Sequence, residues 1–264
     1  MKSNTKSPFL KRIIINNFLL ILFLIFSSVV HASHIPLDQS RNNDLEFTAR
    51  FFYSADKWTS LAEIFKADQV QDQQYKSFLL GSYYRFHENI RAGLFFKRQY
   101  GFRHNADWIV DSVVDWRWRN TNDRAEDLVI FDLSPRVLLP FLPGDGWTFD
   151  FKTRYEYNFF NKDQYLRLVP TVTYYWIRND NPFINVYVQA EQAFPINFKS
   201  EGPTEKWLYL GLLYSFDSQW QVGLSTSKKE MSWKSTDEFV QLTGASYNNK
   251  NSSTAMGLLL IYKL

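Results

Sequence analysis

Two kinds of residue in this chain could do chemistry: a histidine close to a carboxylate, and charged residues that recur at every second position. His104 and Asp107 lie in the polar segment Gly101–Asp107, GFRHNAD. A histidine with a nearby aspartate can act as a general base and the group that orients it. This pair is the candidate catalytic site of a hydrolase. The alternative is a solvated loop, because the chemistry would rest on a single histidine.

The alternating charges are clearest in Trp147–Phe160, WTFDFKTRYEYNFF. Aromatic residues fill one set of alternate positions, and the other set holds Asp150, Lys152, Arg154 and Glu156. A β-strand turns successive side chains to opposite faces, whereas a helix would spread both sets around its circumference. An ordinary strand has about 5–6 residues and a membrane-spanning strand roughly 9–11. The stretch is therefore long enough to cross a bilayer.

The cost of burying charge in lipid decides which face of such a strand points inward. A cation on the lipid side at the bilayer midplane costs roughly 2–4 kcal/mol, so the charged set is expected to face the lumen of a closed barrel. The residues predicted to line this lumen are Arg50, Arg85, Arg91, Lys97, Asp132, Arg136, Asp150, Lys152, Arg154, Glu156, Arg167 and Glu191. They could form ion pairs that close a narrow barrel, or a polar lining that selects a small solute.

The same alternation predicts ten strands. They are Leu45–Tyr53, Lys76–Phe86, Ile90–Tyr100, Leu128–Leu139, Trp147–Phe160, Tyr165–Trp176, Phe183–Ala193, Trp207–Phe216, Trp220–Lys228 and Thr254–Leu264. Two further segments, Trp108–Trp118 and Glu238–Tyr247, would raise the number to twelve. The fold class is therefore all-β: a transmembrane, antiparallel, up-and-down β-barrel of ten strands, with twelve as the alternative.

Loop lengths favour ten strands. Membrane barrels of this kind have short turns on the periplasmic side and longer loops outside. With ten strands, the short turns all lie on the periplasmic side. An added strand at Trp108–Trp118 would move the tight turn Asp217–Gln219 to the outer side. With ten strands, Ser54–Tyr75 is an outer loop. Its segment Trp58–Phe65 has helix-like spacing and would lie across the barrel mouth.

The N-terminus has the layout of a secretory signal peptide. A basic leader precedes the apolar run Phe18–Phe26, and Val30-His31-Ala32 has small or short residues where a signal peptidase reads. The apolar run is shorter than the ~20 residues of a spanning helix, so cleavage after Ala32 is preferred to an uncleaved anchor. The expected domains are the signal peptide 1–32, a periplasmic tail 33–44 and the barrel 45–264.

Composition narrows the function classes. The chain holds 30 Lys and Arg against 27 Asp and Glu, and the leader carries four of the bases and none of the acids. The mature chain would thus have a net charge of −1, with no electrostatic case for nucleic acid. It has no cysteine, which excludes a lipid-modified cysteine and disulfides. Arg and Glu rather than His and Cys dominate the predicted lumen, and no glycine-rich phosphate loop is present, so no metal or cofactor is expected.

The C-terminal segment Gly257–Leu264, GLLLIYKL, resembles the terminal recognition strand of bacterial outer-membrane β-barrel proteins. In that class a glycine is followed by alternating apolar or aromatic residues, and the last residue is usually Phe, where this chain has Leu264. The resemblance implies an outer-membrane location in a Gram-negative bacterium. It implies as partners the lipid, the lipopolysaccharide and, through this strand, the assembly machinery.

Two function hypotheses follow from this class. The first is an outer-membrane barrel that is structural or a channel for small polar solutes, with a charged, narrow lumen. The second is an outer-membrane hydrolase of lipid or peptide with a rim site near His104. Outer-membrane proteases of ten strands use paired acids and a histidine at the rim, and this chain resembles them there only in residue types. The sequence does not indicate the solute or the oligomeric state.

Overall fold

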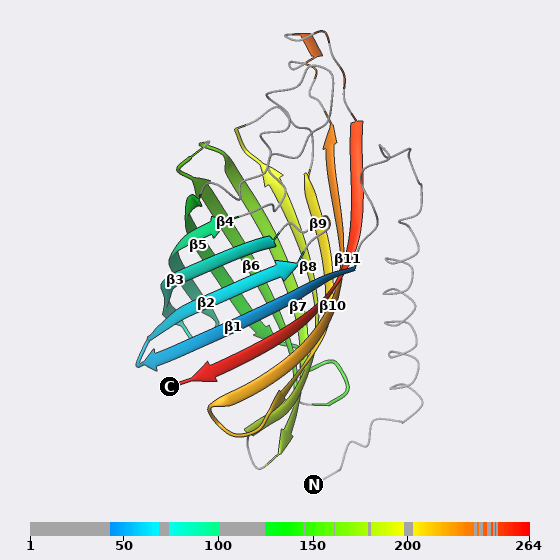
Figure 1. The fold of residues 1–264 in the computed structure, drawn as a ribbon. Helices are drawn as coiled ribbons and strands as arrows, with labels where there is room; N and C mark the ends of the chain where they lie inside the picture. The colour runs from blue at the N-terminus through cyan, green and yellow to red at the C-terminus, as the bar shows by residue number, and fades with distance from the viewer. Residues whose placement is uncertain are drawn as a thin grey trace.

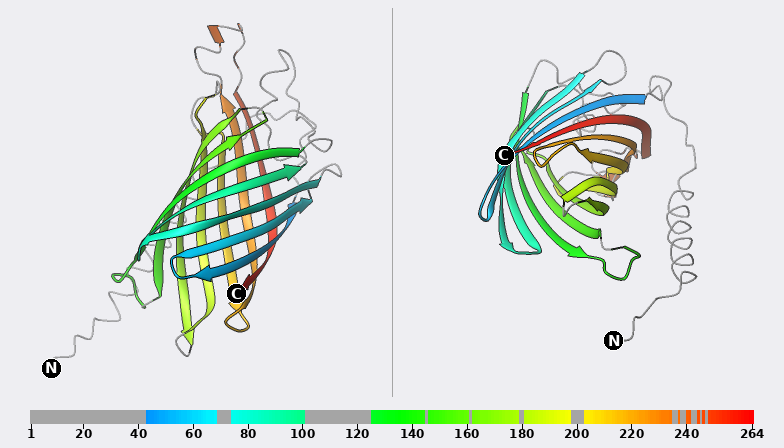
Figure 2. Two further views of the ribbon diagram at one scale, coloured as in Figure 1. Left: turned by 90° about the vertical axis from the view of Figure 1, so that its left-hand side faces the viewer. Right: turned by 90° about the horizontal axis from the view of Figure 1, so that it is seen from below.

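In the computed structural model, the described residues form a closed barrel of eleven strands (Figure 1). It describes residues 43–68, 74–100, 125–144, 146–160, 162–178, 181–197, 203–234, 237, 240–241, 244, 246 and 248–264. The strands are β1 (Asn43–Ala55), β2 (Trp58–Asp68), β3 (Gln74–His87), β4 (Ile90–Tyr100), β5 (Ala125–Leu138), β6 (Trp147–Asn158), β7 (Gln164–Arg178), β8 (Asn181–Pro195), β9 (Glu205–Ser215), β10 (Trp220–Lys234) and β11 (Asn248–Lys263). Seen from below, they form one ring (Figure 2). The predicted all-β barrel is thus confirmed. No helix among the described residues is long and apolar enough to cross a membrane.

The ring closes with a parallel pair of strands. Every strand is antiparallel to its neighbours in sequence, and β1 pairs with β11 in parallel, from Asn43 opposite Thr254 to Phe52 opposite Lys263. An odd number of up-and-down strands gives the first and last strands the same direction. As a result β1 begins at one end of the barrel and Leu264 lies near the other.

The two ends of the barrel differ in their connections. We call the end that carries the C-terminus the turn end; its connections are 56–57, 88–89, 139–146, 179–180 and 216–219. We call the other end the loop end; its connections are 69–73, 101–124, 159–163, 196–204 and 235–247. The two longest connections thus lie at the loop end.

The predicted strand counts of ten and twelve are both wrong, and the reason is β2. This segment was expected to be an outer loop with helix-like spacing, but it pairs along its length with β1 and β3. The turn before it is only two residues long, and Asp56 adopts a φ of 51° there, in the left-handed region that Asp enters more readily than most residues. Trp108–Trp118 lies outside the described residues, and the described residues of Glu238–Tyr247 belong to no strand.

Alternation divides each strand into an outer and an inner face. The strands have between 11 and 16 residues, enough to cross a hydrocarbon layer that needs roughly 9–11. Large apolar side chains on the outer wall are exposed by 40% to 66%; examples are Phe47, Leu80, Leu94, Phe131, Leu210, Leu224 and Met256. The same strands turn most of their charged residues inward.

Aromatic residues gather at the turn end of the outer wall on β2–β3, β6–β7 and β9–β11, and we call them the aromatic belt. Its residues contact one another across and along strands: Trp58 with Tyr84, Tyr84 with Phe86, Trp147 with Tyr174, Tyr174 with Trp176, Tyr214 with Phe216, and Trp220 with Tyr262. The ring centroids of these pairs are between 4.5 and 5.1 Å apart. Each pair lies within a few residues of a turn or of the C-terminus.

Part of the interior is apolar. A buried cluster on β2–β5 is formed by Leu61, Leu79, Tyr83, Phe95 and Ile130, with Phe52 of β1 packed against it. Gly93 makes room for the edge-to-face pair of Tyr83 and Phe95, because a Cβ there would lie 2.5 Å from Phe95 and 2.6 Å from Tyr83. This cluster fills one side of the barrel and leaves the polar residues to line the rest.

Candidate functional site

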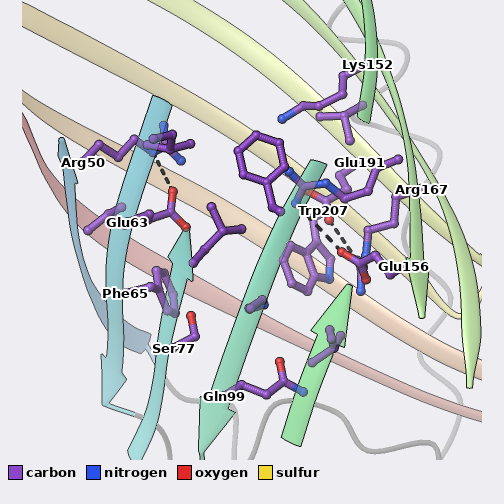
Figure 3. A pocket seen from close by; sticks show the side chains of 18 of the residues that line it. Arg50, Glu63, Phe65, Ser77, Gln99, Lys152, Glu156, Arg167, Glu191 and Trp207 are labelled. Carbon is purple, nitrogen blue, oxygen red and sulfur yellow. Dashed lines mark hydrogen bonds and ion pairs between the residues drawn. The ribbon is translucent and has the colours of Figure 1, made fainter. Parts of the chain in front are cut away.

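A cavity of about 360 Å³ lies inside the barrel, lined by residues from all eleven strands. Figure 3 shows part of its lining from close by. Among the residues predicted to line the lumen, those that line this cavity are Arg50, Arg91, Lys97, Lys152, Arg154, Glu156, Arg167 and Glu191. Arg85 and Arg136 line a second cavity nearer the turn end, as Arg91 also does. Asp132 and Asp150 line neither, but both pair with arginines that do.

Arg167 on β7 is the centre of the largest ionic network among the described residues, which we call the Arg167 network. Its Nε donates to Oε2 of Glu156 at 2.7 Å, and its Nη1 donates to Oε1 of Glu191 at 2.9 Å. The same guanidinium donates to both carboxylate oxygens of Glu205, at 2.7 and 3.3 Å. All four side chains are at most 15% exposed. Three carboxylates thus share one cation.

A second arginine is held by a fully buried carboxylate. Arg154 on β6 donates from Nε and Nη2 to the two oxygens of Asp132 on β5, at 2.7 and 2.9 Å. The hydroxyl of Tyr83 donates to the same carboxylate at 3.0 Å. Asp132 has no exposed surface, so these three hydrogen bonds replace the water it has lost. Nη1 of Arg154 also lies 3.9 Å from Oε1 of Glu156, and this contact joins the Arg154–Asp132 pair to the Arg167 network.

On the opposite wall, Arg50 of β1 donates to Glu63 of β2 at 2.7 Å (Figure 3). A further pair joins Lys229 of β10 to Glu46 of β1. This pair reaches across β11, so it ties together the two strands on either side of it. Ion pairs of this kind narrow the interior and hold its walls together.

Two lysines that line the cavity form no ion pair with a described residue: Lys97 and Lys152. The amine of Lys97 lies 5.7 Å from the centroid of the Tyr75 ring. The amine of Lys152 points into the cavity in Figure 3, with no dashed line to any residue drawn. The cavity therefore offers cationic groups as well as closed ion pairs.

The second cavity, of about 400 Å³, opens near the turn end of β1–β5 and is named here the turn-end cavity. Three of its lining residues are arginines: Arg85, Arg91 and Arg136. Nη2 of Arg136 lies 2.8 Å from Oδ2 of Asp150, and Nη2 of Arg91 lies 3.7 Å from the same oxygen. Arg91 and Tyr83 line both cavities, and the Arg91 guanidinium carbon lies 4.5 Å from the centroid of the Tyr83 ring. This contact therefore lies between the two cavities.

Sequence reasoning missed several interior carboxylates. Glu63 lies on β2, which was expected to be a loop. Glu126 and Glu205 lie two residues before the expected starts of their strands. Glu126 has the parity of Asp132 and Arg136, which were expected to face inward, so extending the alternation by one step would have found it. No residue of the strand after Glu205 had been assigned to the lumen.

The candidate catalytic residues His104 and Asp107 lie outside the described residues, so the hydrolase hypothesis stays a prediction. In the described part of the chain, no group of three or more His, Cys, Asp and Glu residues could hold a metal ion. No protein-family model matches this chain, and no curated protein matches it at a significant level. The barrel and its interior are therefore the features from which a function can be inferred.

Proposed function

We propose that the protein is an integral β-barrel of the bacterial outer membrane whose narrow, ionic interior admits only small polar solutes. The observation that carries this proposal is the outer wall. Large apolar side chains are exposed on it on every strand except β6 and β8, whereas soluble monomers rarely expose contiguous apolar patches larger than a few hundred Å². A closed sheet with a lipid-facing apolar wall and its charges inside is what a bilayer requires.

The aromatic belt and the loop lengths suggest how the barrel would be oriented. Trp and Tyr are enriched where hydrocarbon meets headgroups, so the belt would mark one interface. Short turns are typical of the periplasmic side. The turn end and Leu264 would therefore face the periplasm, and the loop end would meet lipopolysaccharide. β11 would be the strand that the assembly machinery recognises, after removal of the signal peptide 1–32.

The strand number has a consequence for the size of the lumen. Barrels of eight strands are filled by their side chains, and those with sixteen or more leave an aqueous channel. Eleven strands lie between these limits. Bacterial single-chain barrels usually have an even number of strands, whereas odd numbers occur in mitochondrial membranes. The apolar cluster and the interior ion pairs narrow the remaining space, which favours slow passage of small polar solutes.

A planar-bilayer recording tests this proposal. The mature chain, folded in detergent and added to a bilayer, is expected to give discrete openings of low conductance. Tyr83→Ala removes a ring that lines both cavities and is expected to raise that conductance. Bilayers that stay closed with both proteins would overturn solute passage and leave a structural role. Recovery of the mature chain in the soluble periplasmic fraction without detergent would overturn the membrane location.

A further inference from the structure

Among the described residues, the turn-end cavity is lined by four cations, Arg85, Arg91, Arg136 and Lys57, and by two carboxylates, Asp56 and Glu88, with Asp150 beside it. Arg85 and Arg91 are directly opposite each other on β3 and β4, and Arg136 reaches the same cavity from β5. Like charges directly opposite each other on paired strands destabilise a sheet. Such an arrangement is expected where something outside the protein supplies the missing negative charge.

Among the described residues, Asp150 is the carboxylate that pairs with these arginines. It serves Arg136 and Arg91 together, whereas Arg85 forms no ion pair with a described residue. The Arg85 guanidinium donates instead to the backbone carbonyl of Asp56 at 3.2 Å. The Asp56 and Glu88 side chains also line the cavity, but in the described part of the chain neither forms an ion pair with these arginines.

A buried hydroxyl provides a second, independent observation. Ser134 lines the turn-end cavity and is only 1% exposed, yet its Oγ has no hydrogen-bond partner among the described residues. Buried polar groups in native proteins nearly always have a partner. Ser134 lies opposite Arg91 in the pairing of β4 and β5, so the two side chains are on the same face of the sheet. An unpartnered hydroxyl on the same face as these arginines is suited to an oxygen-rich anion.

We propose that the turn-end cavity is a binding site for a small oxyanion, the phosphate or carboxylate group of a solute. Arg85 and Arg91 supply the planar, forked donors that fit such groups, Arg136 adds charge, and Ser134 donates a hydrogen bond. A volume of about 400 Å³ is in the range of small-molecule sites. This inference rests on the proposed function in one respect: the bound solute would be one that passes through the barrel.

Calorimetric titration of the folded protein in detergent micelles tests the site without requiring passage. The two probes are inorganic phosphate and citrate, which separate a phosphate site from a carboxylate site. Arg85→Gln is the informative variant because this side chain contributes no ion pair to the described fold, and it is expected to weaken binding of the preferred probe about fivefold. Arg98→Gln is the matched control: Arg98 is also exposed, but it pairs with Asp127 on the outer wall, 3.7 Å away.

The outcomes separate this site from the proposed function. Binding of either probe that weakens in Arg85→Gln and not in Arg98→Gln supports the site. Failure of both probes to bind the wild-type barrel, or equal binding by both variants, overturns it. Openings in the bilayer without binding reject the site alone, whereas binding without openings rejects passage alone. Heat-modifiable migration on a gel confirms that each variant is folded before titration.

Discussion

The loop-end and turn-end halves of the barrel interior differ in the ratio of carboxylates to arginines and in how exposed these charges are. Around Arg167, three carboxylates share one guanidinium, and every member is nearly buried. At the turn end, Arg136 and Arg91 pair with Asp150 while Arg85 lines the same cavity, and Arg136 is 47% exposed. A charge deep in the wall must be satisfied by other protein groups, because desolvation is costly. A charge at the mouth keeps its water, and so it can remain available to a ligand.

Replacing an arginine in each half tests this difference directly. Arg167→Met removes the cation shared by three buried carboxylates, of which Glu156 keeps only its longer contact with Arg154, and we expect it to lower the free energy of unfolding by about 3–5 kcal/mol. Arg136→Met removes a half-exposed partner of Asp150, and we expect a loss of about 1 kcal/mol or less. Urea unfolding of the detergent-folded barrels, followed by tryptophan fluorescence, measures both.

The matched substitution makes the comparison falsifiable. Both variants lose the same side chain and gain the same one, so intrinsic strand propensity largely cancels. If Arg167→Met were no less stable than Arg136→Met, the Arg167 network would contribute no more than a surface pair. The distinction between the two halves would then fail.

Removing the carboxylate at the turn end should increase the imbalance of charge there. Asp150→Asn frees Arg136 and Arg91 and removes a negative charge next to the bound anion. Because two unit charges about 4 Å apart interact by about 1 kcal/mol in water, we expect phosphate or citrate to bind about fivefold more tightly. Asp127→Asn, on the outer wall, is the control and should leave the affinity unchanged. Weaker binding by Asp150→Asn would mean that Asp150 positions the arginines rather than competing with the ligand.

The sequence predicts the two faces of the barrel better than it predicts the number of strands. Period two is set by the backbone, so the aromatic and charged positions of β6 indicate a strand directly. The turn before β2 is harder to predict from the sequence. It has only two residues, with Asp56 at positive φ, and contains no glycine or proline that would indicate a turn, so the segment after it was interpreted as a loop. The pairing of Arg167 with Glu205 joins residues 38 apart in sequence, and only the ring geometry brings them together.

The smallest effect expected is that of salt, and it should differ between the two halves. Exposed charges are screened over a Debye length that falls from roughly 30 Å at 0.01 M salt to about 3 Å at 1 M, whereas buried pairs are screened much less. Between these salt concentrations we expect phosphate binding at the turn end to weaken a fewfold. The difference in the free energy of unfolding between wild type and Arg167→Met should change with salt by no more than about 0.5 kcal/mol, since that network is shielded from solvent. Equal salt sensitivity of the two quantities would place both sets of charges in the same environment, contrary to their different exposure.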